Sequence, residues 1–136
     1  MRKILLDTNF LTAPFQFDFP VFNEFDRLYG SYQLYTLDDA VQEAKSIEEG
    51  KYRDLVEKLL ETQDIEVLET FDEEPDPSRE GESNEDVDDL LVEISDEFIV
   101  ATNDKELKQR LVDADKEVVI VRGGNHLEKR NSRNLL

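Results

Sequence analysis

Short apolar segments alternate with longer amphipathic segments along this chain, and this alternation restricts the possible fold more than any other feature. Between the apolar segments, residues 20–29 and 39–48 carry apolar side chains at helical spacing. Strands that alternate with helices form parallel sheets covered by helices. We therefore predict an α/β fold with a parallel sheet of about five strands and helices on both faces. The expected strands are residues 3–7, 32–37, 65–68, 98–101 and 118–121.

The length of the chain fits one domain of ordinary size. Its 136 residues are 38% hydrophobic, which suffices for a single core. Residues 71–86, FDEEPDPSREGESNED, are rich in acids and proline and offer almost nothing to bury, so we expect a mobile acidic loop there. We predict one domain over residues 1–123, followed by a basic C-terminal tail over residues 124–136.

Composition excludes several classes of protein. The chain contains no cysteine, so disulfides, zinc–thiolate sites and cysteine nucleophiles are excluded. No apolar run reaches the roughly 18 residues that a membrane span needs. The apolar run after Lys3 ends at Asp7, which is too short for a signal peptide. We expect a cytoplasmic protein with no membrane partner.

The net charge of −18 disfavours tight binding to nucleic acid, because phosphate binding normally depends on Lys and Arg. A diffusely acidic surface also suits a protein dissolved in concentrated salt. The C-terminal segment is the exception, since residues 122–136 hold four basic residues and one acid. A patch that contacts RNA is one interpretation of these residues, and a tail that docks on a protein is the other. The four basic residues are Arg122, Lys129, Arg130 and Arg133.

Two aspartates follow expected strands. Asp7 comes after ILL, and Asp104 comes after FIVATN. The carboxyl ends of parallel strands share one edge of a sheet, so these residues can meet there. Several carboxylates at one point suit a hard cation such as Mg²⁺ or Mn²⁺. Each aspartate has an alternative role as the N-cap of the helix that follows it.

Further acids lie at the margins of expected helices. Glu43 borders the apolar face of its helix. Asp86 and Asp88 lie on opposite flanks of the apolar face of a helix expected near residues 87–94, and helical spacing alone does not choose between them. For each of these acids, a solvated helix margin is the alternative.

Taken together, these acids resemble the pattern of the PIN-domain metal-dependent ribonucleases. That family has Asp-x-Asn after the first strand, a Glu on an early helix, an Asp on a later helix and an Asp after the fourth strand. The matching stretches are LLDTNFL, AVQEAKSI, VDDLLVEI and VATNDKEL, in that order. The resemblance implies a three-layer fold, and it implies that catalysis and metal binding both fall to Asp7, Glu43, Asp88 and Asp104.

The implied activity is endoribonuclease cleavage, with one or two Mg²⁺ or Mn²⁺ ions that activate a water against the phosphodiester. Residues that could orient the carboxylates or the water are Thr8, Asn9, Thr102 and Asn103. TAPFQFDFPVFNEFDRL and VVIVRGGNHLE also resemble the archaeal Fcf-type branch of the family, which implies processing of precursor ribosomal RNA of the small subunit.

Two other functions stay open. Within the family, a toxin ribonuclease of a toxin–antitoxin pair is the first. The second is a ribosome-assembly factor that keeps the fold and binds RNA or protein without cutting. Five phenylalanines within FLTAPFQFDFPVF also leave room for a homodimer or an interface with ribosome-assembly proteins, although packing in the core explains them equally well.

Overall fold

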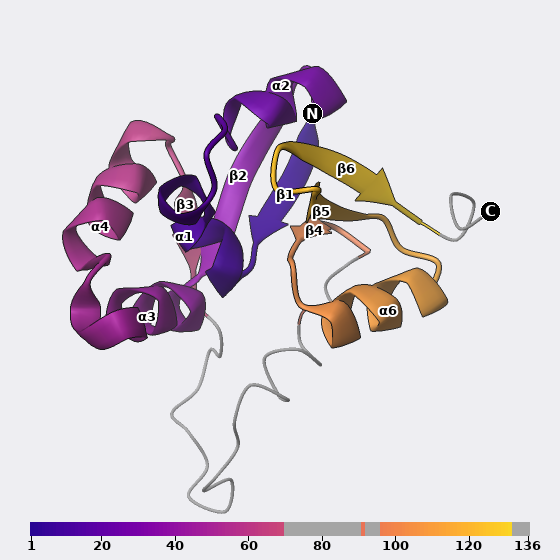
Figure 1. Ribbon diagram of the computed structural model, residues 1–136. Helices are drawn as coiled ribbons and strands as arrows, with labels where there is room; N and C mark the ends of the chain where they lie inside the picture. The colour runs from indigo at the N-terminus through magenta and orange to yellow at the C-terminus, as the bar shows by residue number, and fades with distance from the viewer. Residues whose placement is uncertain (70–90, 92–95, 132–136) are drawn as a thin grey trace, which may run out of the picture.

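The computed structural model describes residues 1–69, 91 and 96–131 (Figure 1). Its strands are β1 (Arg2–Leu6), β2 (Tyr32–Leu37), β3 (Glu66–Leu68), β4 (Ile99–Ala101), β5 (Val118–Arg122) and β6 (His126–Arg130). Its helices are α1 (Thr8–Gln16), α2 (Asn23–Tyr29), α3 (Asp38–Ser46), the short 3₁₀ helix η1 (Ile47–Gly50), α4 (Arg53–Thr62) and α6 (Lys105–Asp113).

The strands form one sheet in the order β3-β2-β1-β4-β5-β6. All neighbouring strands from β3 to β5 pair in parallel, which confirms the predicted α/β architecture. Because parallel strands are joined by right-handed crossovers, the helices before β3 and the helix between β4 and β5 fall on opposite faces. Figure 1 shows this arrangement, with α1, α3 and α4 on one side of the sheet and α6 on the other.

The core follows the apolar pattern of the sequence. On β1 the run Ile4, Leu5 and Leu6 is at most 1% exposed, as expected for a strand with helices on both faces. The helices bury their apolar stripes against the sheet. The buried residues are Ala40, Val41 and Ala44 on α3, and Leu107, Leu111 and Val112 on α6.

A sixth strand extends the sheet beyond the roughly five that the sequence predicts. Gly123 and Gly124 have φ values of 62° and 70°, and this left-handed backbone closes a tight turn after β5. The chain then returns as β6, which pairs antiparallel with β5. Part of the segment expected to be a basic tail is therefore a strand, and residues 132–136 lie outside the described part of the chain.

Helix α2 covers the outer edge of β6. Glu24 Oε1 accepts a hydrogen bond from the backbone N–H of Leu127 at 3.1 Å, and Arg27 Nη2 donates to the Leu127 carbonyl at 2.7 Å. The same two side chains also pair with each other at 3.0 Å. Nearby, Lys129 Nζ lies 4.4 Å from the centre of the Tyr29 ring. These contacts occupy an edge strand that would otherwise expose backbone groups to other chains.

Two of the predicted segments lie wholly or almost wholly outside the described residues. They are the acidic loop over residues 71–86 and the helix near residues 87–94, of which only Leu91 is described, and it is 1% exposed. Among the described helices, none is long and apolar enough to cross a membrane.

The turn between α3 and α4 contains a backbone conformation that suits glycine. Glu48 and Glu49 have φ values of 49° and 59°. Holding a residue that has a side chain in this left-handed backbone conformation costs roughly 1–2 kcal/mol of stability. We expect Glu49→Gly to raise the free energy of unfolding by about 1 kcal/mol in urea titrations. Glu61→Gly, on the exposed part of α4, is the control and should lower it by a similar amount. Equal effects of the two changes would contradict the strain at Glu49.

Candidate active site

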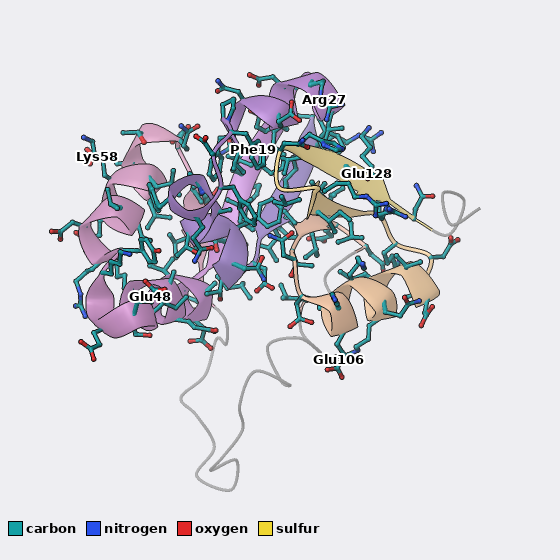
Figure 2. All side chains as sticks on the ribbon, in the orientation of Figure 1. Phe19, Arg27, Glu48, Lys58, Glu106 and Glu128 are labelled. Atoms are coloured by element: carbon teal, nitrogen blue, oxygen red, sulfur yellow. The ribbon has the colours of Figure 1, made fainter. Side chains whose placement is uncertain are left out.

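Asp7 and Asp104 lie at the same edge of the sheet. β1 and β4 are adjacent and parallel, with Leu6 opposite Ala101, so both chains leave the sheet at the same level. The backbone N–H of Asp7 donates to the Ala101 carbonyl at 2.9 Å. We call this region, with Asp7, Glu43 and Asp104, the carboxylate edge. Figure 2 draws the described side chains on the ribbon and labels Glu106 on α6, the helix that follows Asp104.

Asp7 is the most enclosed of these acids. Its Oδ1 accepts the Thr8 N–H at 2.9 Å as the N-cap of α1, and its Oδ2 accepts the Thr102 hydroxyl at 2.7 Å. Burial raises the pKa of the Asp7 carboxyl and the charge of Asp104 raises it further, while these hydrogen bonds partly oppose the rise. Asp7 is therefore both a helix cap and a carboxylate whose charge lacks full compensation.

Glu43 approaches Asp7 from α3. The Thr8 hydroxyl donates to Glu43 Oε2 at 3.3 Å, so Thr8 contacts both acids. Burial raises the pKa of the Glu43 carboxyl, and the charges of Asp7 and of Asp39 add to the effect. Asp39, one helical turn before Glu43, was not singled out from the sequence, although its spacing of four residues indicates the same helix face.

Asp104 is the N-cap of α6. Its Oδ1 accepts the Leu107 N–H at 2.9 Å, as the alternative role for this residue predicts. Capping uses one carboxylate oxygen, and the same side chain is close enough to Asp7 to raise the pKa of that residue. The cap fixes the direction of the Asp104 side chain, which helps to place it at the carboxylate edge.

A polar network joins the loops after β1 and β4. The hydroxyl of Thr102, a fully buried residue, accepts the Asp104 N–H at 3.1 Å in addition to its bond to Asp7. Asn9 Oδ1 accepts the Asn103 N–H at 2.9 Å, and Asn9 Nδ2 lies 3.4 Å from both Asp7 Oδ2 and Thr102 Oγ1. Asn103 Oδ1 accepts the Val121 N–H at 2.8 Å. The side chain of Asn103 thus contacts β5, and its role in orienting a carboxylate or water stays a prediction.

The basic residues singled out from the sequence are spread along the β5–β6 hairpin. Arg122 ends β5 at the carboxyl edge of the sheet, and its side chain is 57% exposed, with Nε 3.6 Å from Glu128 Oε2. Because β6 runs antiparallel, Lys129 and Arg130 lie opposite Val119 and Val118, toward the other end of the hairpin. Arg130 Nε is 3.3 Å from Glu128 Oε1. Arg133 lies outside the described residues.

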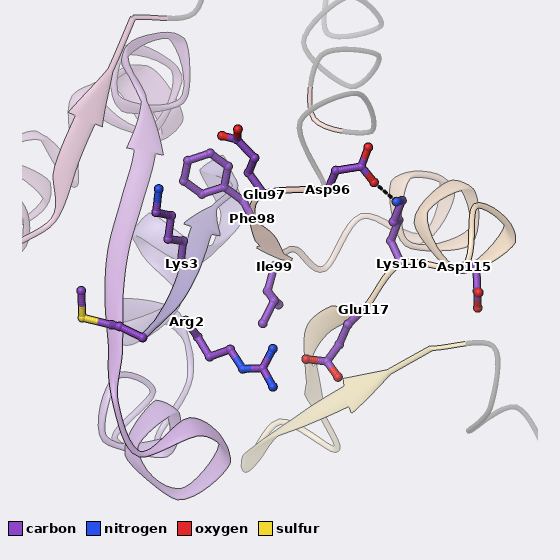
Figure 3. A pocket seen from close by; sticks show the side chains of 10 residues that line it. Arg2, Lys3, Asp96, Glu97, Phe98, Ile99, Asp115, Lys116 and Glu117 are labelled. Atoms are coloured by element: carbon purple, nitrogen blue, oxygen red, sulfur yellow. Dashed lines mark hydrogen bonds and ion pairs between the residues drawn. The ribbon is translucent and has the colours of Figure 1, made fainter.

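A separate cavity of about 590 Å³ opens at the opposite, amino edge of the sheet (Figure 3). Basic and acidic side chains share its wall, and Asp96 pairs with Lys116 there. Lys3 lies beside the Phe98 ring, with Nζ 5.8 Å from its centre. The mixed charges of this cavity differ from the carboxylate edge, where the named charges are all negative.

The raised pKa of Glu43 predicts a pH dependence of stability. The folded state binds the proton of this carboxyl more tightly than the unfolded state, so its contribution is full below about pH 4 and is lost as pH rises through the folded pKa. Glu43→Gln removes this loss and keeps an oxygen for Thr8. We expect the variant and the wild type, both without metal, to unfold at the same urea concentration near pH 3.5, and the variant to be more stable at pH 7. A stability difference that does not change with pH would contradict the prediction.

The donor set suits a hard cation. Carboxylate oxygens are the ligands that Mg²⁺ and Mn²⁺ prefer. Burial raises the pKa of Asp7 and the charge of Asp104 raises it further, and a bound cation would compensate the charge of this buried carboxylate. Within residues 1–69, 91 and 96–131, no three acidic or histidine side chains are close enough together to form a complete metal site. Asp86 and Asp88, the acids predicted to join from the next helix, lie outside these ranges.

Fold and site together define a class: an open, mostly parallel α/β sheet with acids from α3 and from the loops after β1 and β4 at its carboxyl edge. Residues 4–124 match the family model described as a PIN like domain, and the chain belongs to this family.

Thirteen chains of solved structures match the fold. One is the structure of the PIN domain endonuclease Utp24, with a TM-score of 0.70, 22% sequence identity, and coverage of 95% of this chain and 91% of that one. A search of curated proteins finds no match.

Proposed function

We propose that this protein is a metal-dependent endoribonuclease. The observation that carries the proposal is the convergence of Asp7, Glu43 and Asp104 at one edge of a PIN-like fold, where the pKa values of Asp7 and Glu43 are raised. Acids that are held close together with raised pKa values are typical of functional sites. The structure of the PIN domain endonuclease Utp24 shares the fold and supports the same activity.

The residues of the carboxylate edge would hold Mg²⁺ or Mn²⁺, with Asp88 as the fourth acid. When bound, these ions activate water and stabilise charge on the leaving oxygen. Thr8 and Thr102 orient Asp7 and Glu43 through the hydrogen bonds described above. Asn9 holds the loop before Asp104 by accepting the Asn103 N–H. Arg122 would bind a phosphate of the RNA beside this edge.

The substrate in this proposal is precursor ribosomal RNA of the small subunit. Support comes from the resemblance of TAPFQFDFPVFNEFDRL and VVIVRGGNHLE to the archaeal Fcf-type branch. The catalytic unit would be residues 1–123, and residues 124–136 would supply the basic side chains Lys129, Arg130 and Arg133. We place the protein in the cytoplasm, acting with ribosome-assembly proteins or as a homodimer.

The test combines calorimetric titration of Mn²⁺ or Mg²⁺ with cleavage of a precursor ribosomal RNA, at several salt concentrations. We expect saturable metal binding and endonucleolytic products that disappear in EDTA. Asp88→Asn should lose both, whereas Asp54→Asn, an exposed acid on α4, should keep both. Equal metal binding without cleavage in all three proteins would overturn the proposal and favour the non-cleaving assembly factor. Cleavage of many unrelated RNAs would favour the toxin ribonuclease.

A further inference from the structure

We propose that Asn103 is a positioning residue that ties the end of β5, and with it Arg122, to the carboxylate edge. The inference rests on the proposed function, because it concerns how the nuclease would hold its RNA. In this role Asn103 helps Arg122 to bind a phosphate of the substrate strand, and it does not orient a carboxylate.

The contacts of Asn103 form a short path between the two sides of the site. On one side, its backbone N–H donates to Asn9 Oδ1 at 2.9 Å, and Asn9 lies two residues after Asp7. On the other side, its Oδ1 accepts the Val121 N–H at 2.8 Å, and Val121 directly precedes Arg122. Asn103 therefore links the backbone next to Arg122 to the loop that carries Asp7.

The backbone alone does not make this link. The residue pairing between β4 and β5 ends at Ala101 and Val119, and one further bond joins the Thr102 N–H to the Val119 carbonyl at 2.9 Å. After that point the chain turns into the N-cap at Asp104, so β4 no longer runs beside β5. The side-chain carbonyl of Asn103 continues the contact two residues further along β5, to Val121.

Arg122 is a suitable residue to bind a phosphate from this position. Its side chain is 57% exposed at the end of β5, and its contact with Glu128, at 3.6 Å, is long and solvent-exposed, so it contributes little energy that a phosphate would have to replace. An arginine whose backbone is linked to the loops that carry the carboxylates can bind one phosphate while the neighbouring phosphodiester lies at the site.

The alternative role of Asn103 is purely structural, to satisfy the Val121 N–H. The salt dependence of RNA binding separates the two roles. Each phosphate contact on a single strand adds about 0.7 to the magnitude of the slope of log affinity against log salt concentration. A structural role would change the stability of the protein and leave this slope as it is. A positioning role makes the slope fall when either Asn103 or Arg122 is changed.

The experiment measures binding of a fluorescent single-stranded RNA by anisotropy, with Mg²⁺, between about 50 and 200 mM salt. All proteins carry Glu43→Gln so that the RNA is not cleaved. We expect Arg122→Ala and Asn103→Ala each to lower the slope by about 0.7, and the double variant to lower it no further. Gln33→Ala is the matched control: its side-chain amide donates to the Asp64 carbonyl at 2.9 Å, at the amino edge, and its loss should leave the slope unchanged.

The outcomes are separable from those of the proposed function. A wild-type protein that neither binds nor cleaves RNA would overturn both proposals. If the wild type cleaves RNA and Arg122→Ala lowers the slope while Asn103→Ala does not, the nuclease stands and the positioning role is wrong. Slope changes that add in the double variant would also contradict it, because two independent contacts would then be lost. Urea titrations of each variant confirm that the protein measured is folded.

Discussion

Asp104→Asn is expected to reduce metal-dependent RNA cleavage by about a thousandfold, which corresponds to ~4 kcal/mol of lost transition-state stabilisation. The substitution removes one charged oxygen donor from the carboxylate edge. It keeps an oxygen that can accept the Leu107 N–H, so the cap of α6 survives. It also removes the charge that raises the pKa of Asp7, so the protein without metal should be at least as stable as the wild type. Cleavage assays, calorimetric metal titration and urea unfolding of the same preparation measure all three effects.

Asp104→Ala is the companion variant that separates the role of Asp104 as a helix cap from its proposed role as a metal ligand. It removes the same charge and also the cap, which costs about 1 kcal/mol of stability. We expect equal losses of cleavage in the two variants and a lower stability only in the alanine variant. Cleavage that survives in Asp104→Asn would mean that the charge of Asp104 takes no part in catalysis, and that its role is the helix cap alone.

Thr102→Val is expected to destabilise the protein by about 2 kcal/mol, the size typical of leaving buried polar groups without partners. The hydroxyl of Thr102 donates to Asp7 Oδ2 at 2.7 Å and accepts the Asp104 N–H at 3.1 Å, and the residue is fully buried. Valine fills the same volume and can make neither bond. Because the hydroxyl lowers the pKa of Asp7, its loss should also raise that pKa further and weaken metal binding.

Thr102→Ser keeps the hydroxyl and is the control for this prediction. It should retain metal affinity and lose only the small contribution of one buried methyl group. The measurements are urea unfolding without metal and Mn²⁺ titration at two pH values. Equal metal affinity in the valine and serine variants would show that Thr102 fills space in the core and does not support Asp7.

The local structure around the acids could be read from the sequence. ILLDTN and FIVATND each place an acid after an apolar segment, and the structure has β1 followed by Asp7, and β4 followed three residues later by Asp104. The alternative role of each acid, an N-cap, is also present, because a cap depends only on the few residues that follow it. Strand order in the chain and helix faces were predictable for the same reason: they depend on spacing along the sequence.

The contacts that join distant segments were not predictable. β6 pairs with β5 because two left-handed glycines turn the chain back and because Glu24 and Arg27, about a hundred residues earlier, bind Leu127 at the sheet edge. Asn103 contacts Val121, eighteen residues away, through its side-chain oxygen. Such partners are chosen by the packing of the whole sheet, which brings each polar group to whichever neighbour can satisfy it. Thus the sequence by itself determined which acids follow which strands, and only the tertiary structure decided what each polar side chain around them binds.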